Sequence, residues 1–98
     1  MESRAEIGGR MWRIVYTVNS MCQMEEIAGG AITDVFRGEY RAARLLFWGA
    51  VTELQPETTL EQAGEAIDRH IRAGGSLAEI VEICAGALKQ AGFVDEDA

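Results

Sequence analysis

The run YRAARLLFWGAVTEL, residues 40–54, constrains the fold more than any other part of this sequence. It contains no proline and no alternation of apolar and polar residues, so it predicts a helix that ends before Pro56, the single proline of the chain. Apolar residues are distributed around too much of its circumference for an ordinary surface helix. We therefore expect this helix to be covered on several sides or to carry a second contact surface.

The predicted helix has two apolar faces. At about 100° per residue, Leu45 and Trp48 fall roughly opposite the stripe expected to face the core, with Gly49 between them on the surface. Either another element covers them, or they form a patch that binds a partner, because Trp is enriched at binding hot spots. The partner-binding hypothesis comprises Leu45, Trp48, Arg41 and Thr52. The stripe expected in the core comprises Tyr40, Ala43, Phe47, Ala50, Val51 and Leu54.

The clear β-strand pattern lies in residues 4–18. Gly8 and Gly9 can adopt the positive φ angles of a two-residue hairpin turn. A lone hairpin is marginally stable in water, so we expect helices to cover one face of it. Its outer strand has an unpaired edge carrying only Arg4 and Glu6 as charged side chains, which predicts weak self-association by edge pairing. The residues expected to face the core are Trp12, Ile14, Tyr16 and Val18.

Capping pairs and glycine pairs predict the remaining helices. The predicted capping pairs are Ser20 with Gln23, Thr58 with Glu61, and Ser76 with Glu79. The corresponding helices end at Gly29-Gly30, at about Ala73 before Gly74-Gly75, and at about Ala91, and a short helical turn is expected at residues 32–36. The stripe predicted on the second of these helices comprises Leu60, Gly64, Ile67 and Ile71. The face predicted on the last comprises Leu77, Ile80, Val81, Cys84, Leu88 and Ala91.

These elements predict a mainly α fold in one domain. A hairpin at residues 4–18 precedes a small bundle of four to five helices over residues 20–91, and residues 94–98 are expected to form an acidic, disordered tail. A chain of 98 residues has room for a single modest core.

The charge of the chain narrows the class of partner. A net charge of −7 and a pI of about 4.6 weigh against binding to nucleic acid or anionic lipid, which requires a basic face. The cluster of Arg37, Arg41 and Arg44 is interpreted as the solvated side of one helix. No segment has the length of a membrane span or the pattern of a signal peptide, so a cytosolic protein is expected.

The sequence contains no convincing catalytic or metal-binding group. Cys22, Cys84 and His70 occur at no recognised zinc spacing, and the two cysteines are expected to be free thiols. His70 is expected at the boundary of its helix rather than as a general base, and Glu65 and Asp68 as solvated carboxylates. We therefore expect no cofactor, no metal and no enzymatic activity.

Three segments, in this order and spacing, resemble the small tail assembly chaperones of phages and the related proteins of gene transfer agents. EIGGRMWRIVYTVNSMCQMEEIAG, residues 6–29, resembles their opening hairpin and short helix. LLFWGAVTELQPETTLEQAGEAID, residues 45–68, resembles their middle, and IVEICAGALKQAGF, residues 80–93, their closing helix. The chain departs from the family at residues 53–55, where relatives often carry a His or another polar residue before the proline.

The resemblance implies a protein without enzymatic activity that binds the tape measure protein and keeps it soluble while tail tube subunits polymerise around it. The implied partners are therefore the tape measure protein and the tail tube protein. The implied location is the cytoplasm of the bacterial host, and the protein would be absent from the mature particle. Two alternatives need the same helical surface: a small helical head–tail connector or adaptor, which would form stable rings and stay in the virion, and a host regulatory or antitoxin-like module.

Overall fold

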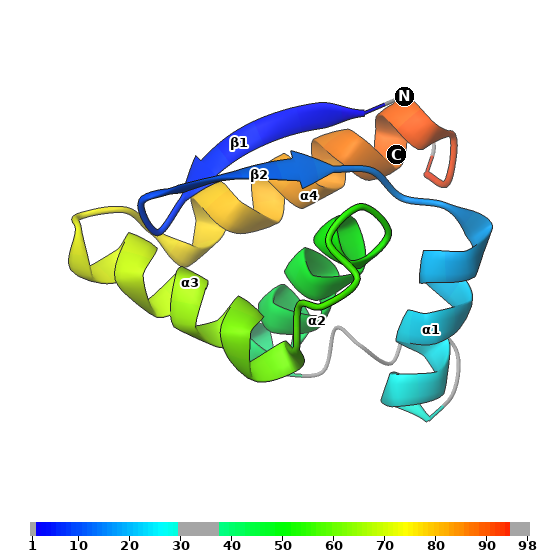
Figure 1. Cartoon of the computed structure of the whole chain (residues 1–98), viewed down its shortest axis with the longest axis horizontal. Coiled ribbons are helices and arrows are strands. Elements are labelled where there is room, and N and C mark those ends of the chain that lie inside the picture. The colour runs from blue at the N-terminus through cyan, green and yellow to red at the C-terminus, as the bar shows by residue number, and fades with distance from the viewer. Residues whose placement is uncertain (1, 30–37, 95–98) are drawn as a thin grey trace.

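The computed structural model describes residues 2–29 and 38–94 (Figure 1). In this part of the chain, a two-stranded antiparallel hairpin is followed by four helices, which confirms the predicted fold class. The elements are β1 (Ser3–Ile7), β2 (Arg10–Ile14), α1 (Val18–Ala28), α2 (Glu39–Thr52), α3 (Leu60–Arg72) and α4 (Leu77–Ala91). The helical turn predicted at residues 32–36, Arg37, and residues 95–98 of the predicted tail lie outside the described residues.

The hairpin turns at the glycine pair, as predicted. Gly8 and Gly9 have φ angles of 64° and 80°, and the register runs from Ser3 opposite Ile14 to Ile7 opposite Arg10. The prediction that Val18 faces the core is wrong, because β2 ends at Ile14 and Val18 is the first residue of α1, with 66% of its surface exposed. The buried residues of this region are Ile7, Trp12, Ile14 and Tyr16.

The first helix starts with a different capping pair from the one predicted. The Thr17 hydroxyl accepts a hydrogen bond from the Ser20 backbone N–H at 3.1 Å, and the Ser20 hydroxyl accepts one from the Thr17 N–H at 2.9 Å. Thr17 is therefore the N-cap, and Ser20 takes the third helical position that the prediction gave to Gln23. Gly29 ends the helix in the left-handed conformation, as predicted.

The capping box of α3 is displaced by one residue, and that of α4 is the predicted one. Thr59 is the N-cap of α3 and exchanges hydrogen bonds with Gln62, because Thr58 is buried in the connection that precedes the helix. The predicted pair at residues 58 and 61 is therefore wrong by one position. Ser76 and Glu79 form the predicted box at the start of α4.

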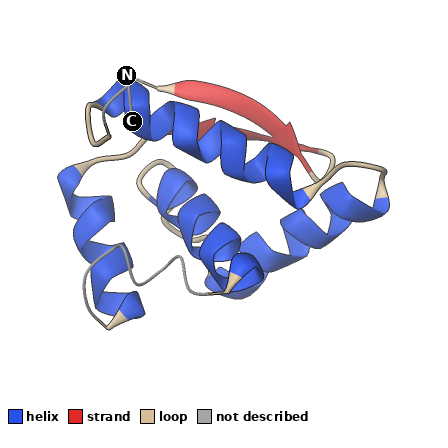
Figure 2. Cartoon of the chain, turned by 180° about the vertical axis from the view of Figure 1, so that it is seen from behind, coloured by secondary structure: helices blue, strands red, loops and turns tan. Residues whose placement is uncertain are grey.

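Helix α2 is the central element of the fold. It contacts α1, α3, α4 and β2, and in Figures 1 and 2 the other elements surround it. The ring of Phe47 is fully buried and meets the ring of Trp12 edge-on, with 5.2 Å between centroids. Two residues of the predicted core stripe behave differently, since Tyr40 is 70% exposed and Leu54 is half-buried. The stripe residues with no exposed surface are Ala43, Phe47, Ala50 and Val51.

Helix α3 buries Ile67 of the predicted stripe together with two alanines, whereas Ile71 is 39% exposed and Leu60 is half-buried. The hairpin turn approaches α3 so closely that a Cβ on Gly8 would lie 2.6 Å from the carbonyl oxygen of Ala66. This close approach favours a small residue at position 66. The buried residues of α3 are Ala63, Ala66 and Ile67, and those of α4 are Ile80, Cys84, Ala87 and Leu88.

The side chain of Gln55 joins the hairpin to the end of α2. Its Oε1 accepts a hydrogen bond from the Arg13 N–H at 2.9 Å, and its Nε2 donates to the Arg13 carbonyl oxygen at 3.1 Å. The same Nε2 also donates to the Val51 carbonyl oxygen at 2.6 Å. Beside it, the Val15 N–H donates to the Ala50 carbonyl oxygen at 2.9 Å. The amide of Gln55 thus pairs with β2 as a neighbouring strand would.

Candidate functional site

The exposed patch predicted at Leu45 is not present in the structure. Leu45 and Thr52 are each only 6% exposed, and Gly49 is buried. Helix α1 covers this side of α2, because the side chain of Met24 packs directly against Gly49 and a Cβ there would overlap the Met24 Sδ. The glycine expected on the surface is therefore the contact point between the two helices.

Trp48 is half-buried and has a structural partner. Its Nε1–H donates a hydrogen bond to the Thr58 carbonyl oxygen at 2.9 Å, and its ring packs against the core. The indole thereby ties α2 to the segment that leads into α3. Of the four residues in the partner-binding hypothesis, only Arg41 is exposed. The other reading of the sequence, a central helix covered on several sides, describes the structure.

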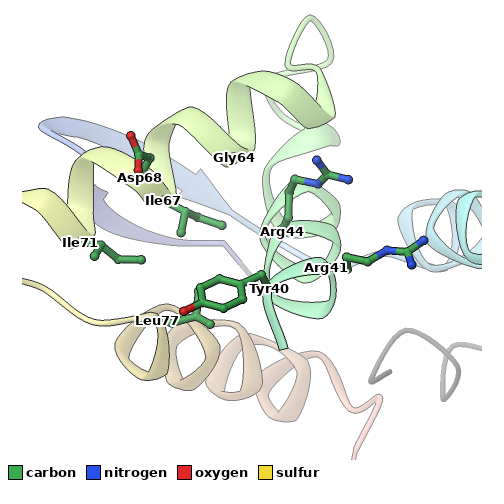
Figure 3. A pocket seen from close by; sticks show the side chains of 8 residues that line it. All are labelled: Tyr40, Arg41, Arg44, Gly64, Ile67, Asp68, Ile71 and Leu77. Atoms are coloured by element: carbon green, nitrogen blue, oxygen red, sulfur yellow. The ribbon is translucent and has the colours of Figure 1, made fainter. Parts of the chain in front are cut away.

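A surface pocket of about 270 Å³ lies between the start of α2, the face of α3 and the first residue of α4 (Figure 3). We call it the α2–α3 groove. Apolar side chains from all three helices form its interior, and two arginines and one carboxylate border it. Its lining residues are Tyr40, Arg41, Arg44, Gly64, Ile67, Asp68, Ile71 and Leu77.

Two large, partly exposed side chains give the groove its apolar surface. The ring of Tyr40 lies beside Leu77, and Ile67 and Ile71 project from α3 toward it (Figure 3). Tyr40 and Ile71 are both among the exposed large hydrophobic residues of the described chain. An exposed aromatic and an exposed aliphatic side chain on two sides of one pocket are the arrangement that accepts an apolar side chain from another molecule.

The arginines give one border of the groove a positive charge. The side chain of Arg44 lies over Gly64, and a Cβ added to Gly64 would be 3.3 Å from the Arg44 Cδ. The guanidinium groups of Arg41 and Arg44 extend away from Ile67 and Ile71 (Figure 3). Neither forms an ion pair with another residue of the described segments. An acidic group beside the bound apolar side chain would thus meet two unpaired cations.

A second pocket, of about 350 Å³, lies between α2 and α4. It shares Leu77 with the α2–α3 groove, but carboxylates instead of arginines stand at its border. The start of α2 thus separates a basic-bordered pocket from an acidic-bordered one. The lining residues of the second pocket are Glu39, Ala42, Leu46, Leu77, Ala78, Val81 and Glu82.

His70 lies at the boundary of its helix and beside the cap of α4. Its Nε2 is 3.3 Å from the Glu79 Oε1, without the geometry of a hydrogen bond. That same oxygen accepts a hydrogen bond from the Ser76 N–H at 2.6 Å, and this bond is the main cause that lowers the pKa of Glu79 below its ordinary value. The arrangement caps the start of α4.

The two cysteines occupy different environments. Cys84 is buried, and burial raises its pKa to about 11, whereas Cys22 is exposed. Tyr16, next to Cys84, donates its hydroxyl to the Leu46 carbonyl oxygen at 2.6 Å, and burial raises its pKa. Within residues 2–29 and 38–94, no three His, Cys, Asp or Glu side chains converge on a common point, and no helix is long and apolar enough to cross a membrane.

Sequence reasoning assigned the two exposed hydrophobic residues of the groove to core stripes. Tyr40 begins the predicted stripe of α2, and Ile71 ends that of α3. Tyr40 lies just after Gly38, the N-cap of α2, and Ile71 lies just before Gly74, which follows the end of α3. Both glycines have positive φ angles. The sequence therefore did contain a sign that these two side chains would be exposed: each stands at the end of its stripe, next to the boundary of its helix.

Comparisons with known proteins leave this geometry without a named counterpart. A scan of protein-family models, a search of curated proteins and a search of solved structures each find no match to the chain.

Proposed function

We propose that this chain is a tail assembly chaperone of a phage or phage-like particle, which binds an apolar helical stretch of the tape measure protein and has no enzymatic activity. Two lines of reasoning support the proposal. The first is the resemblance over residues 6–93, in the order and spacing of its three segments. The second, and the observation that carries it, is the α2–α3 groove with Tyr40 and Ile71 exposed beside it.

The open shape of the groove favours a protein segment over a small molecule, because small-molecule sites enclose most of their ligand. A pocket of about 270 Å³ that is open to the surface suits one or two apolar side chains presented by a helix. Contact of this extent gives weak, reversible binding, which a chaperone that must leave the finished assembly requires.

The charges around the groove favour a particular kind of helix. Arg41 and Arg44 would pair with an acidic residue that flanks the apolar anchor, while the net charge of −7 on the whole chain disfavours a generally acidic partner. The best occupant is an amphipathic stretch with an isolated Asp or Glu next to Leu, Ile, Met or Phe. In this role the chain acts in the host cytoplasm, meets the tail tube protein as the tube forms and is absent from the mature particle.

Co-expression with the tape measure protein of the same genome tests the proposal. The decisive variant is Ile71→Gln, and Ile27→Gln is its matched control. Ile71 and Ile27 are the penultimate residues of α3 and α1, and they are 39% and 47% exposed. We expect Ile71→Gln to reduce both the soluble yield of the tape measure protein and its affinity for the chaperone, by about tenfold or more. Ile27→Gln should change neither.

Three results would contradict the proposal. The tape measure protein could stay insoluble with the unmodified chain, the two variants could act alike, or Ile71→Gln could lower the melting temperature enough to explain its effect. Detection of the chain as a stable ring in purified particles would instead favour the head–tail connector.

A further inference from the structure

Among residues 2–29 and 38–94, one edge of the hairpin is covered, and the other forms no hydrogen bond with another element. Gln55 and the Ala50 carbonyl oxygen occupy the outer edge of β2, as described above. The N–H and C=O of Arg13 point away from β1, toward Gln55. Arg4 lies directly opposite Arg13 in the register. In an antiparallel pair of strands, two opposed residues point their backbone groups either both toward each other or both outward, so the N–H and C=O of Arg4 point away from β2. Glu6, two residues further on, is oriented in the same way. The outer edge of β1 therefore presents the backbone groups of Arg4 and Glu6.

This edge lies at the rim of the molecule. In Figures 1 and 2, β1 forms the outermost strand, and α4 runs beneath the hairpin. The side chains of Arg4 and Glu6 are both exposed, on the face opposite the buried Ile7. Unpaired strand edges of this kind accept a further strand through main-chain hydrogen bonds.

The charges on the edge have no partner within their own hairpin. Arg4 stands opposite Arg13, a like charge, and Arg13 is already held by Glu2 at 2.6 Å and 3.0 Å. In the described chain, neither Arg4 nor Glu6 forms an ion pair. The edge is thus a short strand with one unpaired cation and one unpaired anion, two residues apart on the same face.

We propose that two copies of this chain pair through the outer edges of β1, antiparallel, about a twofold axis at Ala5. In this register Arg4 of one copy lies opposite the partner's Glu6, and Glu6 opposite the partner's Arg4. Each of these opposed pairs exchanges two main-chain hydrogen bonds, because all four residues have their backbone groups turned outward. Each also brings opposite charges together across the strands, which stabilises the pairing.

The neighbouring registers are disfavoured by charge. A twofold axis at Arg4 would place Arg4 opposite the partner's Arg4 and Glu2 opposite the partner's Glu6. A twofold axis at Glu6 would place two carboxylates opposite each other. Like charges directly opposed are destabilising, so the alternation of Arg4, Ala5 and Glu6 selects the register centred on Ala5. It also selects a second copy of this chain as the occupant, because the sequence of the edge is complementary to itself.

The dimer is weak and closed. A strand of five residues buries little surface, so we expect a dissociation constant of about 10–100 µM that rises with salt concentration. The pairing is isologous, and the second edge of each hairpin is covered, so assembly ends at a four-stranded sheet. The inference goes beyond the proposed function and does not depend on it, since the purified chain alone forms the dimer.

Charge reversal provides the test, measured by sedimentation equilibrium from 5 to about 500 µM, a range that spans the expected constant. Glu6→Arg and Arg4→Glu each turn both cross-strand pairs into like charges, and we expect each to weaken the dimer at least tenfold. The double variant Arg4→Glu/Glu6→Arg restores opposite charges in the same register and should recover the original constant within about threefold. Arg69→Glu makes the same change of charge as Arg4→Glu but on the exposed side of α3, so it is the control for that variant and should leave the constant unchanged.

A proline variant tests the backbone part of the pairing. Glu6→Pro removes an N–H that faces outward, so it leaves the hairpin intact while it abolishes the dimer. Circular dichroism and the melting temperature confirm that each variant is folded. The proposal is overturned if the unmodified chain is a monomer throughout the concentration range, if the double variant fails to recover the dimer, or if folded Glu6→Pro dimerises normally.

Discussion

The C-terminal half of α2 and the first turn of the same helix differ in how far other elements cover them. The C-terminal half, from Leu45 to Thr52, is covered by the hairpin and the other helices, and Trp48 is its single residue that is not fully buried. The first turn, Glu39 to Arg41, is exposed and borders two pockets. In the sequence the C-terminal half is the more hydrophobic, yet it is the less hydrophobic first turn that lies at the surface.

The difference shows that the position of a residue along a helix can decide whether its side chain is buried, even against its hydrophobicity. Helix α1 meets α2 near Gly49, and the connection to α3 meets it at Trp48, so the large side chains of that half already have neighbours. Tyr40 extends beyond those contacts. The exposed apolar side chain of Tyr40 therefore lies where α2 projects past the other elements, and the first three predictions below test whether α2 is divided in this way.

The largest effect is expected from truncation of the covered half. Phe47→Ala removes a fully buried ring that packs edge-on against Trp12, and it should lower the free energy of unfolding by about 3–5 kcal/mol through the cavity it leaves. Tyr40→Ala, in the first turn, should change it by less than about 0.5 kcal/mol. Urea denaturation of both variants measures the contrast, and equal losses would remove the distinction between the two halves.

The contact between α1 and α2 should tolerate no added methyl group. Gly49→Ala places a Cβ where the Met24 side chain lies, and Met24 is fully buried and has little room to move, so we expect a loss of about 1–3 kcal/mol. The shorter side chain of Met24→Ala opens that space. In a double-mutant cycle, the combined variant should therefore lose less stability than the sum of the two single variants. Strict additivity would mean that the two residues do not meet.

Trp48 should contribute to stability through its indole N–H. Trp48→Phe keeps an aromatic ring but leaves the Thr58 carbonyl oxygen without its donor, at an expected loss of about 1 kcal/mol, or about 4–8 °C in melting temperature. Binding to the tape measure protein should be unchanged. If Trp48→Phe melts normally and binds poorly, Trp48 belongs to the binding surface after all.

Thiol reactivity probes how tightly α4 is packed in the core without changing the sequence. The pKa of Cys84, about 11, leaves roughly one thiolate in a thousand at pH 8, and burial also excludes the reagent. A disulfide reagent should therefore modify Cys22 at once and Cys84 only as the fold opens. Because the folded state holds the Cys84 proton more tightly, stability should fall as the pH rises from about 9 to about 11. Rapid modification of both thiols at pH 8 would show that the core around Cys84 opens readily.

The boundaries of the elements were predictable because local chemistry sets them. The turn at Gly8 and Gly9, the left-handed end of α1 at Gly29 and the Ser76–Glu79 box all follow from residues close together in the sequence. The remaining capping boxes were displaced because several neighbouring hydroxyl residues can cap, and tertiary contacts decide among them. Thr58, for example, is buried with its carbonyl oxygen bound to Trp48, so Thr59 caps α3.

The proposed binding surface was not predictable to the same extent. Whether Leu45 is covered depends on where α1 lies, and the contact that places α1 involves Gly49, which resembles any surface glycine in a helical pattern. Of the predicted partner-binding residues, Arg41 also lines the groove. Periodicity identifies the faces of each helix, but the choice between covered and open faces is made by contacts between residues far apart in the chain.

Gln55 has a consequence for how the molecule unfolds. Its amide bonds at once to the backbone of Arg13 in the hairpin and to the last turn of α2 at Val51, so neither can separate without breaking bonds to the other. A hairpin that was merely laid against the helices could fray as an independent unit, whereas this one shares its hydrogen bonds with the central helix. Loss of the strands and loss of the helices should therefore occur in a single cooperative transition, followed equally by the amide protons of residues 10–14 and by those of α2.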